Sequence, residues 1–547
     1  MEPVILGSGP LGATNPPHVR HSISMSLPTW ESVGRWGLRE KWMIPLMQTC
    51  YPRFAIHKSL QQLKDAIFTR LSIPEQMDCL IFPSADASTR CIEMLTSKHP
   101  SEEIQRVVFS LARSTNTEES RWTTLFVIVY PEACARSAMF FWKIFGYGIS
   151  SRHADYCLSV FPQMSSNAKN PVFQSSASSL CLEEPTQWKN SATTEKQFLK
   201  EKIATLVSSD QPGYSPVSSQ DVFLFPTGMC AISAVIRALR PSQDVESEAV
   251  TYGWPYAETL HCIQECGYTK STLLSAGSTQ ELDELESLLA AGRDIHVLFC
   301  EVPSNPLLRT PDLLRIHALA SKFNFIVVCD ETLGSFYNVD VLPYVDVVVT
   351  SLTKIFSGLC NVMGGSVVVN PHSSQYATIH SALTRIYEDI YFPLDAITMA
   401  RNSANFEMRV KQCNSNSLSV ASLLTSHPAV LNVNHPSLGP SRHVYDRIRR
   451  KNGGYGYLLS IVFHQPKDAV AFYDALDLCK GPSVGTEFSL AIPYSLLAHF
   501  SEQDWAEING VDRHMVRISI GIEQEHELLG RIKKALQHTN QTERITS

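Results

Sequence analysis

The chain is organised around the stretch Asp346-Val-Val-Val-Thr-Ser-Leu-Thr-Lys354. Its three consecutive valines predict a buried strand, and the lysine comes just past the end of that strand, beside Ser351 and Thr353. A lysine held at the end of a buried strand can lose its proton and form a Schiff base with an aldehyde cofactor. Most Thr-Lys pairs are exposed and have no catalytic role, so the meaning of Lys354 depends on the residues around it.

The sequence on both sides of this stretch alternates apolar runs with amphipathic runs of helical period. The apolar runs predict strands at 222–225, 295–300, 325–329, 345–349 and 366–369. The amphipathic runs predict helices at 231–239, 283–290 and 313–323. Strands that alternate with helices and are apolar on both faces indicate an α/β fold with a mostly parallel sheet.

Composition and pattern divide the chain into four parts. We expect an N-terminal extension over 1–163, a serine-rich linker or loop over 164–194, a large α/β domain over 195–395, and a small α+β domain over 396–547. Within the extension, the apolar alternation at 23–27 predicts a short strand.

Charge and cysteine content exclude several classes of protein. The 547 residues carry a formal net charge of −7 and no basic block, which argues against binding of nucleic acid or an anionic membrane surface. No apolar run is long enough to span a bilayer, and the N-terminus does not resemble a secretory signal. The fourteen cysteines show neither CxxC pairs nor zinc-type spacing, so we expect no metal site and a reducing compartment, the cytoplasm.

Polar residues follow the ends of four predicted strands. In open α/β sheets, ligands bind beyond the carboxyl ends of the strands. Four groups of residues occupy such positions: Gly228 with Met229, then Asn305, Asp330 and Lys354. We therefore expect these groups to meet at one edge of the sheet.

Each group has a functional and a structural interpretation. The turn at Gly228 precedes a helix whose free N–H groups suit a phosphate, although a plain strand-to-helix turn is as common. Asn305 could simply belong to a turn. Asp330 follows an apolar strand, and a buried carboxylate needs a cation or hydrogen bonds, which either a helix cap or a protonated ring nitrogen would supply. Tyr252 could stack on a cofactor ring or be a core tyrosine.

Together these groups supply what pyridoxal phosphate requires. Lys354 would form the Schiff base, and Asp330 would keep the ring nitrogen protonated so that the ring withdraws electrons. The turn at Gly228, with Ser351 and Thr353, would offer N–H and O–H donors to the phosphate.

Longer motifs extend this interpretation over nearly the whole chain. Those of the cofactor half are Phe225-Pro-Thr-Gly-Met229, Tyr252-Gly-Trp-Pro-Tyr256, Glu301-Val-Pro-Ser-Asn-Pro-Leu-Leu308, Asp330-Glu-Thr332, Ser351-Leu-Thr-Lys354 and Asn361-Val-Met-Gly-Gly365. Others are His21-Ser-Ile-Ser-Met-Ser-Leu-Pro-Thr-Trp30, Tyr51-Pro-Arg-Phe54, Ser483-Val-Gly-Thr486 and Val511-Asp-Arg-His-Met-Val-Arg-Ile-Ser519. With these motifs the chain resembles the cystathionine γ-synthase group of pyridoxal-phosphate enzymes of cysteine and methionine metabolism, and most of all its fungal type.

The resemblance implies a fold-type I transferase, similar to aspartate aminotransferase, and assigns roles to individual residues. Lys354 would hold the cofactor and Asp330 would pair with its ring nitrogen, while Tyr252 would stack on the ring and act in catalysis. The phosphate would be bound by Gly228, Met229, Ser351 and Thr353. Arg517 would grip the α-carboxylate of the substrate as a bidentate fork, helped by Asn305 and Ser483; without the resemblance, Arg517 would be taken for a surface ion-pair residue.

The sequence departs from the family pattern at three places. The wider family has an arginine shortly after its stacking tyrosine, where this chain has Pro255-Tyr256-Ala257. The wider family also has a Tyr-x-Arg element that reaches the phosphate of a neighbouring subunit; Tyr51-Pro52-Arg53 is the only good candidate for it here, and it lies far from the core motifs in sequence. Ser483-Val-Gly-Thr486 replaces a more glycine-rich stretch near the substrate. These departures concern the substrate more than the cofactor.

The resemblance implies γ-replacement on an O-acylhomoserine, with cysteine as the nucleophile and cystathionine as the product. Such an enzyme would serve transsulfuration and methionine biosynthesis as a homodimer or homotetramer. γ-Elimination, or sulfhydrylation or thiol addition with another nucleophile in a specialised pathway, remains an alternative. A degenerate relative with only a structural or regulatory role is a third reading, against which the joint presence of Lys354, Asp330 and Arg517 argues.

Overall fold

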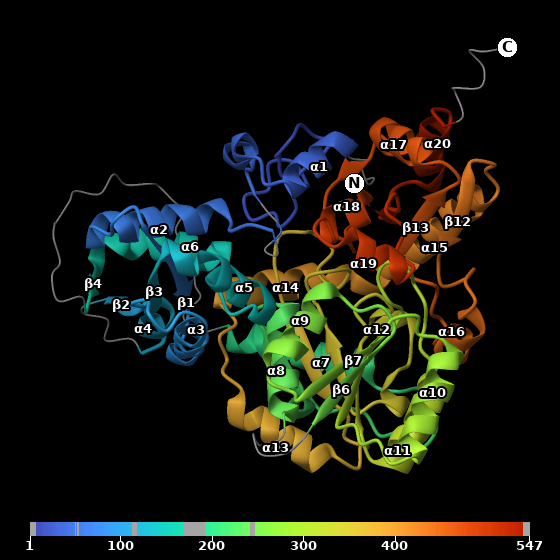
Figure 1. Cartoon of the computed structure of the whole chain (residues 1–547), viewed down its shortest axis with the longest axis horizontal. Coiled ribbons are helices and arrows are strands. Elements are labelled where there is room, and N and C mark those ends of the chain that lie inside the picture. The colour runs from blue at the N-terminus through green and yellow to red at the C-terminus, as the bar shows by residue number, and fades with distance from the viewer. Residues whose placement is uncertain are drawn as a thin grey trace.

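The computed structural model describes residues 7–49, 51, 54–111, 117–167, 192–240 and 247–539. Most of the serine-rich linker predicted at 164–194 lies outside these residues, as does Arg53. The described parts form three sheets with helices packed around them (Figure 1).

The large domain is built on a seven-stranded sheet. Its strand order is β5 (Val222–Phe225), β11 (Gly365–Val369), β10 (Val347–Thr350), β9 (Ile326–Asp330), β8 (Val297–Glu301), β6 (Glu248–Tyr252) and β7 (Lys270–Leu274). All these strands are parallel except β11, which pairs antiparallel with both β10 and β5. The predicted α/β fold with a mostly parallel sheet is confirmed, and the five predicted strands each lie within a residue or two of an observed one.

Helices cover both faces of this sheet because its strands are apolar on both faces. One face carries α8 (Gly228–Leu239), α9 (Ala257–Glu265) and α13 (Tyr376–Ile386). The other carries α7 (Thr193–Val207), α10 (Thr279–Ala290), α11 (Leu313–Phe323) and α14 (Pro393–Asn402). The short helix α12 (Ser335–Asn338) follows β9.

The small domain has a five-stranded sheet with the order β12 (Val430–Asn434), β13 (Leu458–Phe463), β16 (Val516–Ser519), β15 (Leu490–Pro493) and β14 (Cys479–Lys480). Three helices share its core, namely α15 (Phe406–Thr425), α17 (Pro466–Ala475) and α20 (Glu525–Leu536). Shorter helices complete it at α16 (Arg442–Ile448), α18 (Tyr494–Ala498) and α19 (Gln503–Ile508).

The N-terminal region consists of two parts. Residues 7–49, which include α1 (Trp30–Gly37), pack on the small domain, and Met25, Leu27 and Trp36 enter its core. The strand predicted at 23–27 is not formed as a strand: within the described residues, the segment has only an isolated antiparallel bridge between Met25 and Thr14, while the N–H of Ile23 donates to the carbonyl of Cys360 and that of Leu27 to the carbonyl of Lys480 in β14.

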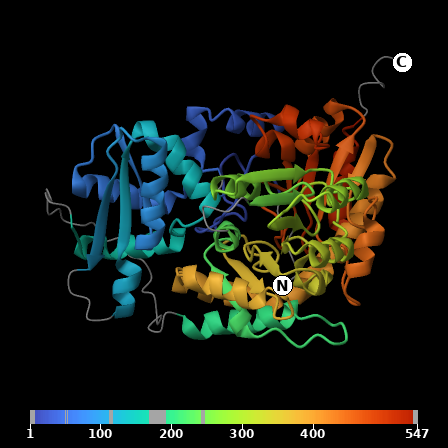
Figure 2. The ribbon, with the colours of Figure 1, turned by 60° about the horizontal axis from the view of Figure 1, so that its bottom comes forward.

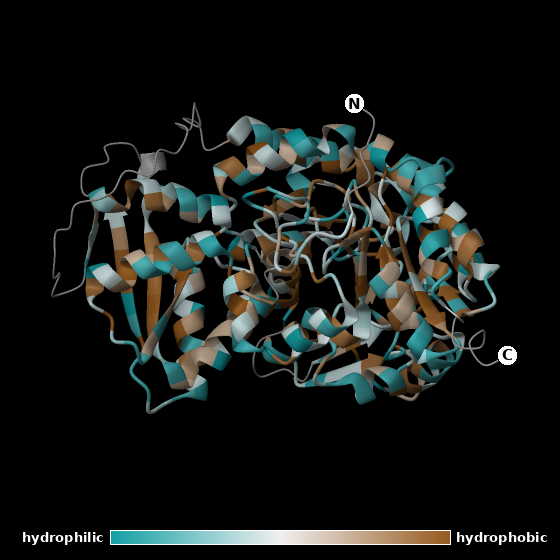
Figure 3. Ribbon diagram, turned by 90° about the horizontal axis from the view of Figure 1, so that it is seen from above, coloured by the Kyte–Doolittle hydropathy of each residue, from teal (hydrophilic) through white to brown (hydrophobic). Residues whose placement is uncertain are grey.

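The second part is an α+β unit with its own antiparallel sheet. Its strand order is β1 (Met77–Phe82), β3 (Leu125–Pro131), β2 (Gln105–Leu111) and β4 (Met164–Ser166). Around the sheet lie α2 (Lys58–Leu71), α3 (Ala85–Lys98), α4 (Thr117–Thr123), α5 (Ala135–Phe145) and α6 (Ser151–Val160). The unit forms one end of the molecule (Figure 2), and its strands are largely brown between helices with teal outer faces (Figure 3).

This N-terminal unit shares a core with the large domain. Phe141 and Phe145 of α5 lie in the same buried cluster as Ala234 and Val235 of α8. Thr227, just before α8, donates its hydroxyl to the carbonyl of Gly146 at 3.2 Å. Helix α5 is thereby placed beside the N-terminus of α8.

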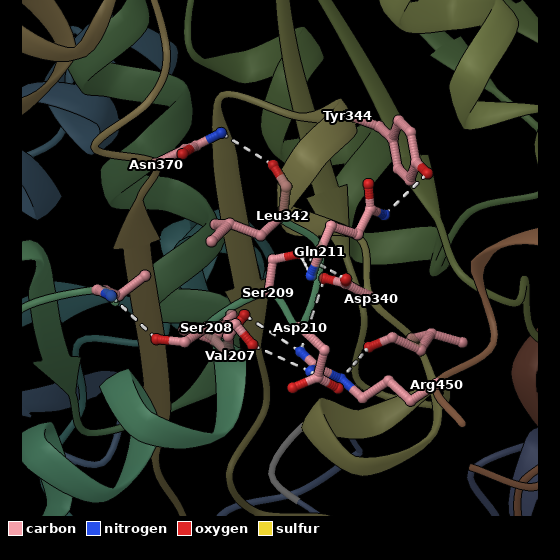
Figure 4. A network of polar contacts seen from close by, with 12 residues as sticks. Val207, Ser208, Ser209, Asp210, Gln211, Asp340, Leu342, Tyr344, Asn370 and Arg450 are labelled. Carbon is pink, nitrogen blue, oxygen red and sulfur yellow. Dashed lines mark hydrogen bonds and ion pairs between the residues drawn. The ribbon is translucent and has the colours of Figure 1, made fainter. Parts of the chain in front are cut away.

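A polar network around Arg450 ties the small domain to the large one (Figure 4). The guanidinium donates to the carbonyls of Ser208 and Val207 at the end of α7, at 3.0 and 3.2 Å. It also lies 3.7 Å from Asp340, whose carboxylate accepts a 2.6 Å hydrogen bond from Ser209. A cation at a helix C-terminus complements the helix dipole, so this contact stabilises the junction.

None of the described helices combines the length and apolar character of a membrane span. Among the described residues, no group of three or more His, Cys, Asp and Glu side chains is arranged to hold a metal ion. The described cysteines are buried thiols.

Candidate active site

A large cavity opens where the large domain, the small domain and the N-terminal region meet. Its volume, including the part that is open to solvent, is about 1380 Å³. The carboxyl ends of β5, β8, β9 and β10 contribute the residues predicted from the sequence: Gly228, Met229, Asn305, Asp330, Ser351, Thr353, Lys354 and, from β16, Arg517. Eight of the ten predicted site residues therefore lie on one cavity.

The turn between β5 and α8 forms one end of the cavity. Thr227 caps α8 by accepting the N–H of Cys230 at 2.9 Å, and the first N–H groups of a helix have no partner inside it. A Cβ added at Gly228 would lie 2.8 Å from the side chain of Ser351, so only glycine permits this close approach. The turn, the helix N-terminus and the Ser351 hydroxyl form a cradle suited to a phosphate.

The residues after β10 bring Lys354 into the cavity. The N–H of Ser351 donates to the hydroxyl of Thr332 at 2.8 Å, and the hydroxyl of Thr353 donates to the carbonyl of Gly364 at 3.2 Å. Thr353 lines the cavity, but its hydroxyl already serves this loop contact, so it fixes the lysine loop more directly than it offers a donor to a ligand. The Lys354 amine donates to the hydroxyl of Tyr51 at 2.6 Å.

Two carboxylates, Glu301 and Asp330, lie side by side at the ends of β8 and β9, where they are paired in register. Burial raises the pKa of Asp330, against hydrogen bonds from Thr332 and the positive charge of Lys354. Burial also raises the pKa of Glu301 well above its ordinary value, and the neighbouring charge of Asp330 adds to this effect. Asp330 is a partly buried carboxylate on the cavity wall, with which a protonated ring nitrogen would pair.

Arg517, on β16 of the small domain, lines the same cavity. Its guanidinium donates to the side-chain oxygen of Asn305 at 3.2 Å and to the carbonyl of Pro482 at 2.9 Å. It also lies over the ring of Tyr494, 5.1 Å from the centroid. These contacts fix a planar donor fork, which suits a carboxylate.

Two predicted site residues do not line this cavity. The Tyr252 side chain is 2% exposed and packs in the large-domain core, where its hydroxyl donates to the carbonyl of Ser278 at 2.9 Å. Tyr256, four residues later, lines the cavity in its place. Ser483 is buried beside the Cys360 thiol, while its neighbours Pro482 and Val484 face the cavity. The stacking and carboxylate-binding roles predicted for Tyr252 and Ser483 stay predictions, and Tyr252 lines a smaller pocket together with Glu301 and Asp330.

Part of the cavity wall comes from residues that the sequence did not single out. The N-terminal region contributes Trp142, Lys143, Gly146, Gly148 and Ile149, together with Phe54, and the small domain contributes Ile492, Leu497 and Ala498. The residue motif Tyr51-Pro-Arg-Phe54 was the only sequence signal that pointed to the N-terminal contribution. No local pattern marks Trp142, which reads as part of an ordinary amphipathic helix.

The chemistry of these residues fits pyridoxal phosphate. The turn at Gly228 would suit a phosphate, Asp330 would pair with a cation, and a lysine amine lies in the same cavity. These three functions are the ones that the cofactor requires of a protein.

Comparison with known proteins points to the same cofactor. The family described as "Cys/Met metabolism PLP-dependent enzyme" matches residues 183–537, and "Fungal trans-sulfuration enzyme, N-terminal domain" matches residues 59–150. A "Cystathionine gamma-synthase-like protein ankD" of Aspergillus thermomutatus is 47% identical over 98% of this chain and 96% of its own length. A "Cystathionine gamma-synthase" of Neurospora crassa is 33% identical over 96% of this chain and 98% of its own.

Other relatives show how far the family extends. An "Alanine racemase ungC" of Aspergillus violaceofuscus is 30% identical over 96% of each chain. The crystal structure of cystathionine γ-lyase from yeast superposes with a TM-score of 0.54 at 25% identity, covering 63% of this chain and 85% of that one. The fold is that of the fold-type I pyridoxal-phosphate enzymes. The chain belongs to the family of pyridoxal-phosphate-dependent enzymes of cysteine and methionine metabolism.

Proposed function

We propose that the chain catalyses γ-replacement on an O-acylated homoserine, with cysteine as the nucleophile and cystathionine as the product. The observation that carries the proposal is the presence of Lys354 and Arg517 on one cavity that also contains Asp330 and the turn at Gly228. An amino acid whose carboxylate is bound by Arg517 would present its Cα toward the side of the cavity that holds Lys354. The similarity to proteins named cystathionine γ-synthase supports the same reaction.

Individual residues would bind the cofactor and the substrate. Gly228, Met229 and Ser351 would bind the phosphate, and Asp330 would pair with the ring nitrogen of pyridoxal phosphate. When bound, the cofactor withdraws electrons from the α-carbon of the substrate, so that the α-proton becomes acidic. Arg517, oriented by Asn305, would hold the α-carboxylate.

Lys354 would move the protons. Its amine would take the proton from Cα, pass it on within the bound substrate and cofactor, and so be free to take one from Cβ, after which the γ-acyloxy group would leave as a carboxylate. The thiol would add at Cγ with loss of its own proton to solvent, and the same amine would then return protons to Cβ and Cα, one at a time. The cavity walls would keep water from competing with the thiol.

A second candidate nucleophile is favoured by the composition of the wall. Cysteine carries an ammonium and a carboxylate, and burying these groups without charged partners is costly. Five charged side chains line the cavity within the described residues: Lys143, Glu301, Asp330, Lys354 and Arg517. The Lys143 amine lies 3.9 Å from the carboxylate of the buried Glu258. Asp330, Lys354 and Arg517 have the roles proposed above, and Glu301 is paired in register with Asp330. The remaining wall is largely apolar, which favours an uncharged thiol in a specialised pathway as the alternative.

One experiment tests both candidates. Purified holoenzyme is given O-acetylhomoserine or O-succinylhomoserine with cysteine, with ethanethiol, or with no thiol, and products are measured by mass spectrometry. Cystathionine formed faster than 2-oxobutyrate supports the main proposal, and a higher kcat/KM with ethanethiol than with cysteine supports the alternative. Equal 2-oxobutyrate formation in all three arms would identify a γ-eliminating lyase instead. Lys354→Ala is the inactive control.

We also infer that the enzyme is a cytoplasmic homodimer or homotetramer serving methionine biosynthesis, with family resemblance as the support. Light scattering during size-exclusion chromatography measures the assembly directly. A strain lacking its own cystathionine γ-synthase, supplied with this chain, tests the pathway: growth without methionine is expected.

A further inference from the structure

The turn that follows β6 carries a tryptophan into the small domain. Trp254 lies two residues after the end of that strand, and its side chain is 1% exposed. The cluster of buried side chains around it includes Leu307 of the large domain, but its other members belong to the small domain: Val462, Tyr494, Ala506, Val511 and Met515. Trp254 is therefore a large-domain side chain that is buried mainly by the small domain.

Aromatic rings connect Trp254 to Arg517. The Trp254 ring meets the ring of His499 edge-on, with 5.3 Å between their centroids and 66° between their planes. The His499 ring lies 5.5 Å from that of Tyr494, whose own centroid lies 5.1 Å from the Arg517 guanidinium. Rings at such distances attract one another, and a guanidinium is attracted to the face of a ring. A continuous series of side-chain contacts thus runs from Trp254 to Arg517.

The same turn also reaches the side of the cavity that holds Asp330. Tyr256 lines the cavity, and its backbone N–H donates to the carboxylate of Glu301 at 2.5 Å. Glu301 is paired in register with Asp330. Only Pro255 separates Trp254 from Tyr256, and the ring of a proline fixes its φ, which leaves the turn little freedom. One short turn is therefore anchored next to Asp330 at one end and in the cluster behind Arg517 at the other.

We propose that Trp254 is a positioning residue that sets the distance between Arg517 and the cofactor-binding side of the cavity. An amino acid bound by its carboxylate and its amine at once needs one fixed distance between the two binding groups. A smaller side chain at 254 would leave a space that the neighbouring elements partly fill, and Arg517 would move with them. The inference rests on the carboxylate-binding role proposed for Arg517, and not on which nucleophile the enzyme uses.

The test measures binding of two unreactive ligands to the full-length holoenzyme. L-Norvaline has the amine and carboxylate of the substrate but no leaving group, and n-butylamine is the same molecule without the carboxylate. Titration of the visible absorption of the cofactor gives a dissociation constant for each. Trp254→Phe should weaken norvaline about tenfold, within the loss expected for a misplacement of about 1 Å, and leave n-butylamine unchanged. Equal weakening of both ligands, or of neither, would overturn the proposal.

Trp122→Phe is the matched control. The Trp122 side chain is also 1% exposed and also meets a histidine ring edge-on, that of His153, but it belongs to the core of the N-terminal unit rather than to the cavity wall. This variant should bind both ligands as the wild type does. A loss of norvaline affinity as large as that in Trp254→Phe would show that any buried tryptophan has this effect, and the proposal would fail.

Arg517→Lys separates the two inferences. It should weaken norvaline and spare n-butylamine; if it leaves norvaline unchanged, the role of Arg517 in the proposed function is wrong. If Arg517→Lys weakens norvaline and Trp254→Phe does not, only the role of Trp254 is wrong. The double variant should bind norvaline no more weakly than Arg517→Lys alone, because two residues that act through one contact are not additive.

A second variant interrupts the series of contacts in its middle. His499→Leu keeps Trp254 and Tyr494 but removes the ring between them. It should also weaken norvaline and leave n-butylamine unchanged, and it decides the question if Trp254→Phe does not fold. Wild-type affinity for norvaline in His499→Leu would contradict a coupling that runs through these rings.

Discussion

Gly485 packs directly against the backbone of Lys354. A Cβ added at Gly485 would lie 3.0 Å from the carbonyl carbon of Lys354 and closer still to the N–H of Ile355. Gly485 has a φ of +70°, in the left-handed region that favours glycine. The small-domain loop at 482–486 therefore packs against the backbone of Lys354 and limits how far that backbone can move.

Gly485→Ala should displace Lys354 and lower cofactor occupancy and kcat about tenfold or more, since overpacking of a close contact costs about 1–3 kcal/mol. Gly510→Ala is the matched control: Gly510 has a φ of +89°, but nothing lies within 4 Å of its added Cβ. Absorption at saturating cofactor measures occupancy. Equal losses in both variants would show that backbone strain alone is responsible.

Asp330→Asn should have opposite effects on cofactor binding and on stability. Loss of the partner of the ring nitrogen should weaken cofactor affinity about 100-fold, the order expected for a buried ion pair. In the cofactor-free protein the raised pKa of Asp330 means that ionisation of this carboxyl lowers the stability of the fold. The loss of stability develops as the pH rises from 3.8, the pKa in the unfolded chain, through the higher pKa in the folded protein.

At neutral pH, cofactor-free Asp330→Asn should therefore melt at a higher temperature than the wild type. Glu301→Gln serves as the comparison, because the raised pKa of Glu301 makes the amide a close mimic of its protonated form. Its cofactor affinity should fall far less than that of Asp330→Asn. A lower melting temperature for cofactor-free Asp330→Asn would contradict the burial argument.

Arg517→Lys should raise the KM for the amino-acid substrate about 100-fold with a smaller change in kcat. Lysine keeps the charge but cannot reproduce a planar fork fixed by Asn305 and Pro482. Arg513→Lys, at an exposed ion pair on Asp504, is the control and should leave KM unchanged. Steady-state kinetics over a range of substrate concentrations separates the two constants.

Lys480 should make the docking of the N-terminal segment depend on pH. Its amine donates to the carbonyl of Pro28 at 2.8 Å and to that of Asp474 at 3.1 Å, and burial lowers its pKa from 10.5 to about 8. Above 10.5 the amine is neutral in both states; between 10.5 and 8 only the unfolded state binds the proton. The loss of folding stability caused by burying this amine is therefore complete below about pH 8, and it disappears as the pH rises toward 10.5.

The free energy of unfolding of the wild type, relative to Lys480→Met, should thus increase between pH 8 and pH 10 and stay level between pH 6 and pH 7. Denaturant titrations at these pH values measure the difference. Lys533→Met, on the exposed side of α20, should show no such increase. A difference that shrinks with rising pH would reverse the sign of the argument.

Arg450→Met should lower the free energy of unfolding by about 3 kcal/mol, because it leaves Asp340 buried without its cation and three carbonyls without a donor. Arg442→Met removes a pair with Asp446 in which the arginine is 58% exposed, and it should cost less than about 1 kcal/mol. Thermal unfolding followed by circular dichroism compares them. Similar losses would mean that the junction does not depend on this network.

The large domain and much of its site could be predicted from sequence for a simple reason. Apolar β-branched runs mark parallel strands, and the carboxyl ends of such strands meet at one edge, so Gly228, Asn305, Asp330 and Lys354 had to converge. Arg517 entered only through family resemblance, because a lone arginine has no local signature.

The placement of the Tyr252 side chain could not be predicted from the sequence pattern. It is the last residue of β6, and its side chain continues the strand's alternation into the core. The chain then turns at Gly253, with a φ of +84°, and brings Tyr256 to the cavity instead. The N-terminal wall could not be predicted either, since its contacts depend on tertiary packing between residues hundreds of positions apart.

The placement of α5 against α8 has a consequence for how such an enzyme can change. The side chains that would contact the cofactor come from the large domain, whereas Trp142 and Ile149, which line the same cavity, belong to the N-terminal unit with its own sheet. Substitutions in the N-terminal unit can therefore reshape the pocket without altering those cofactor contacts. One catalytic apparatus can in this way be adapted to new substrates by mutating a region that takes no part in the chemistry.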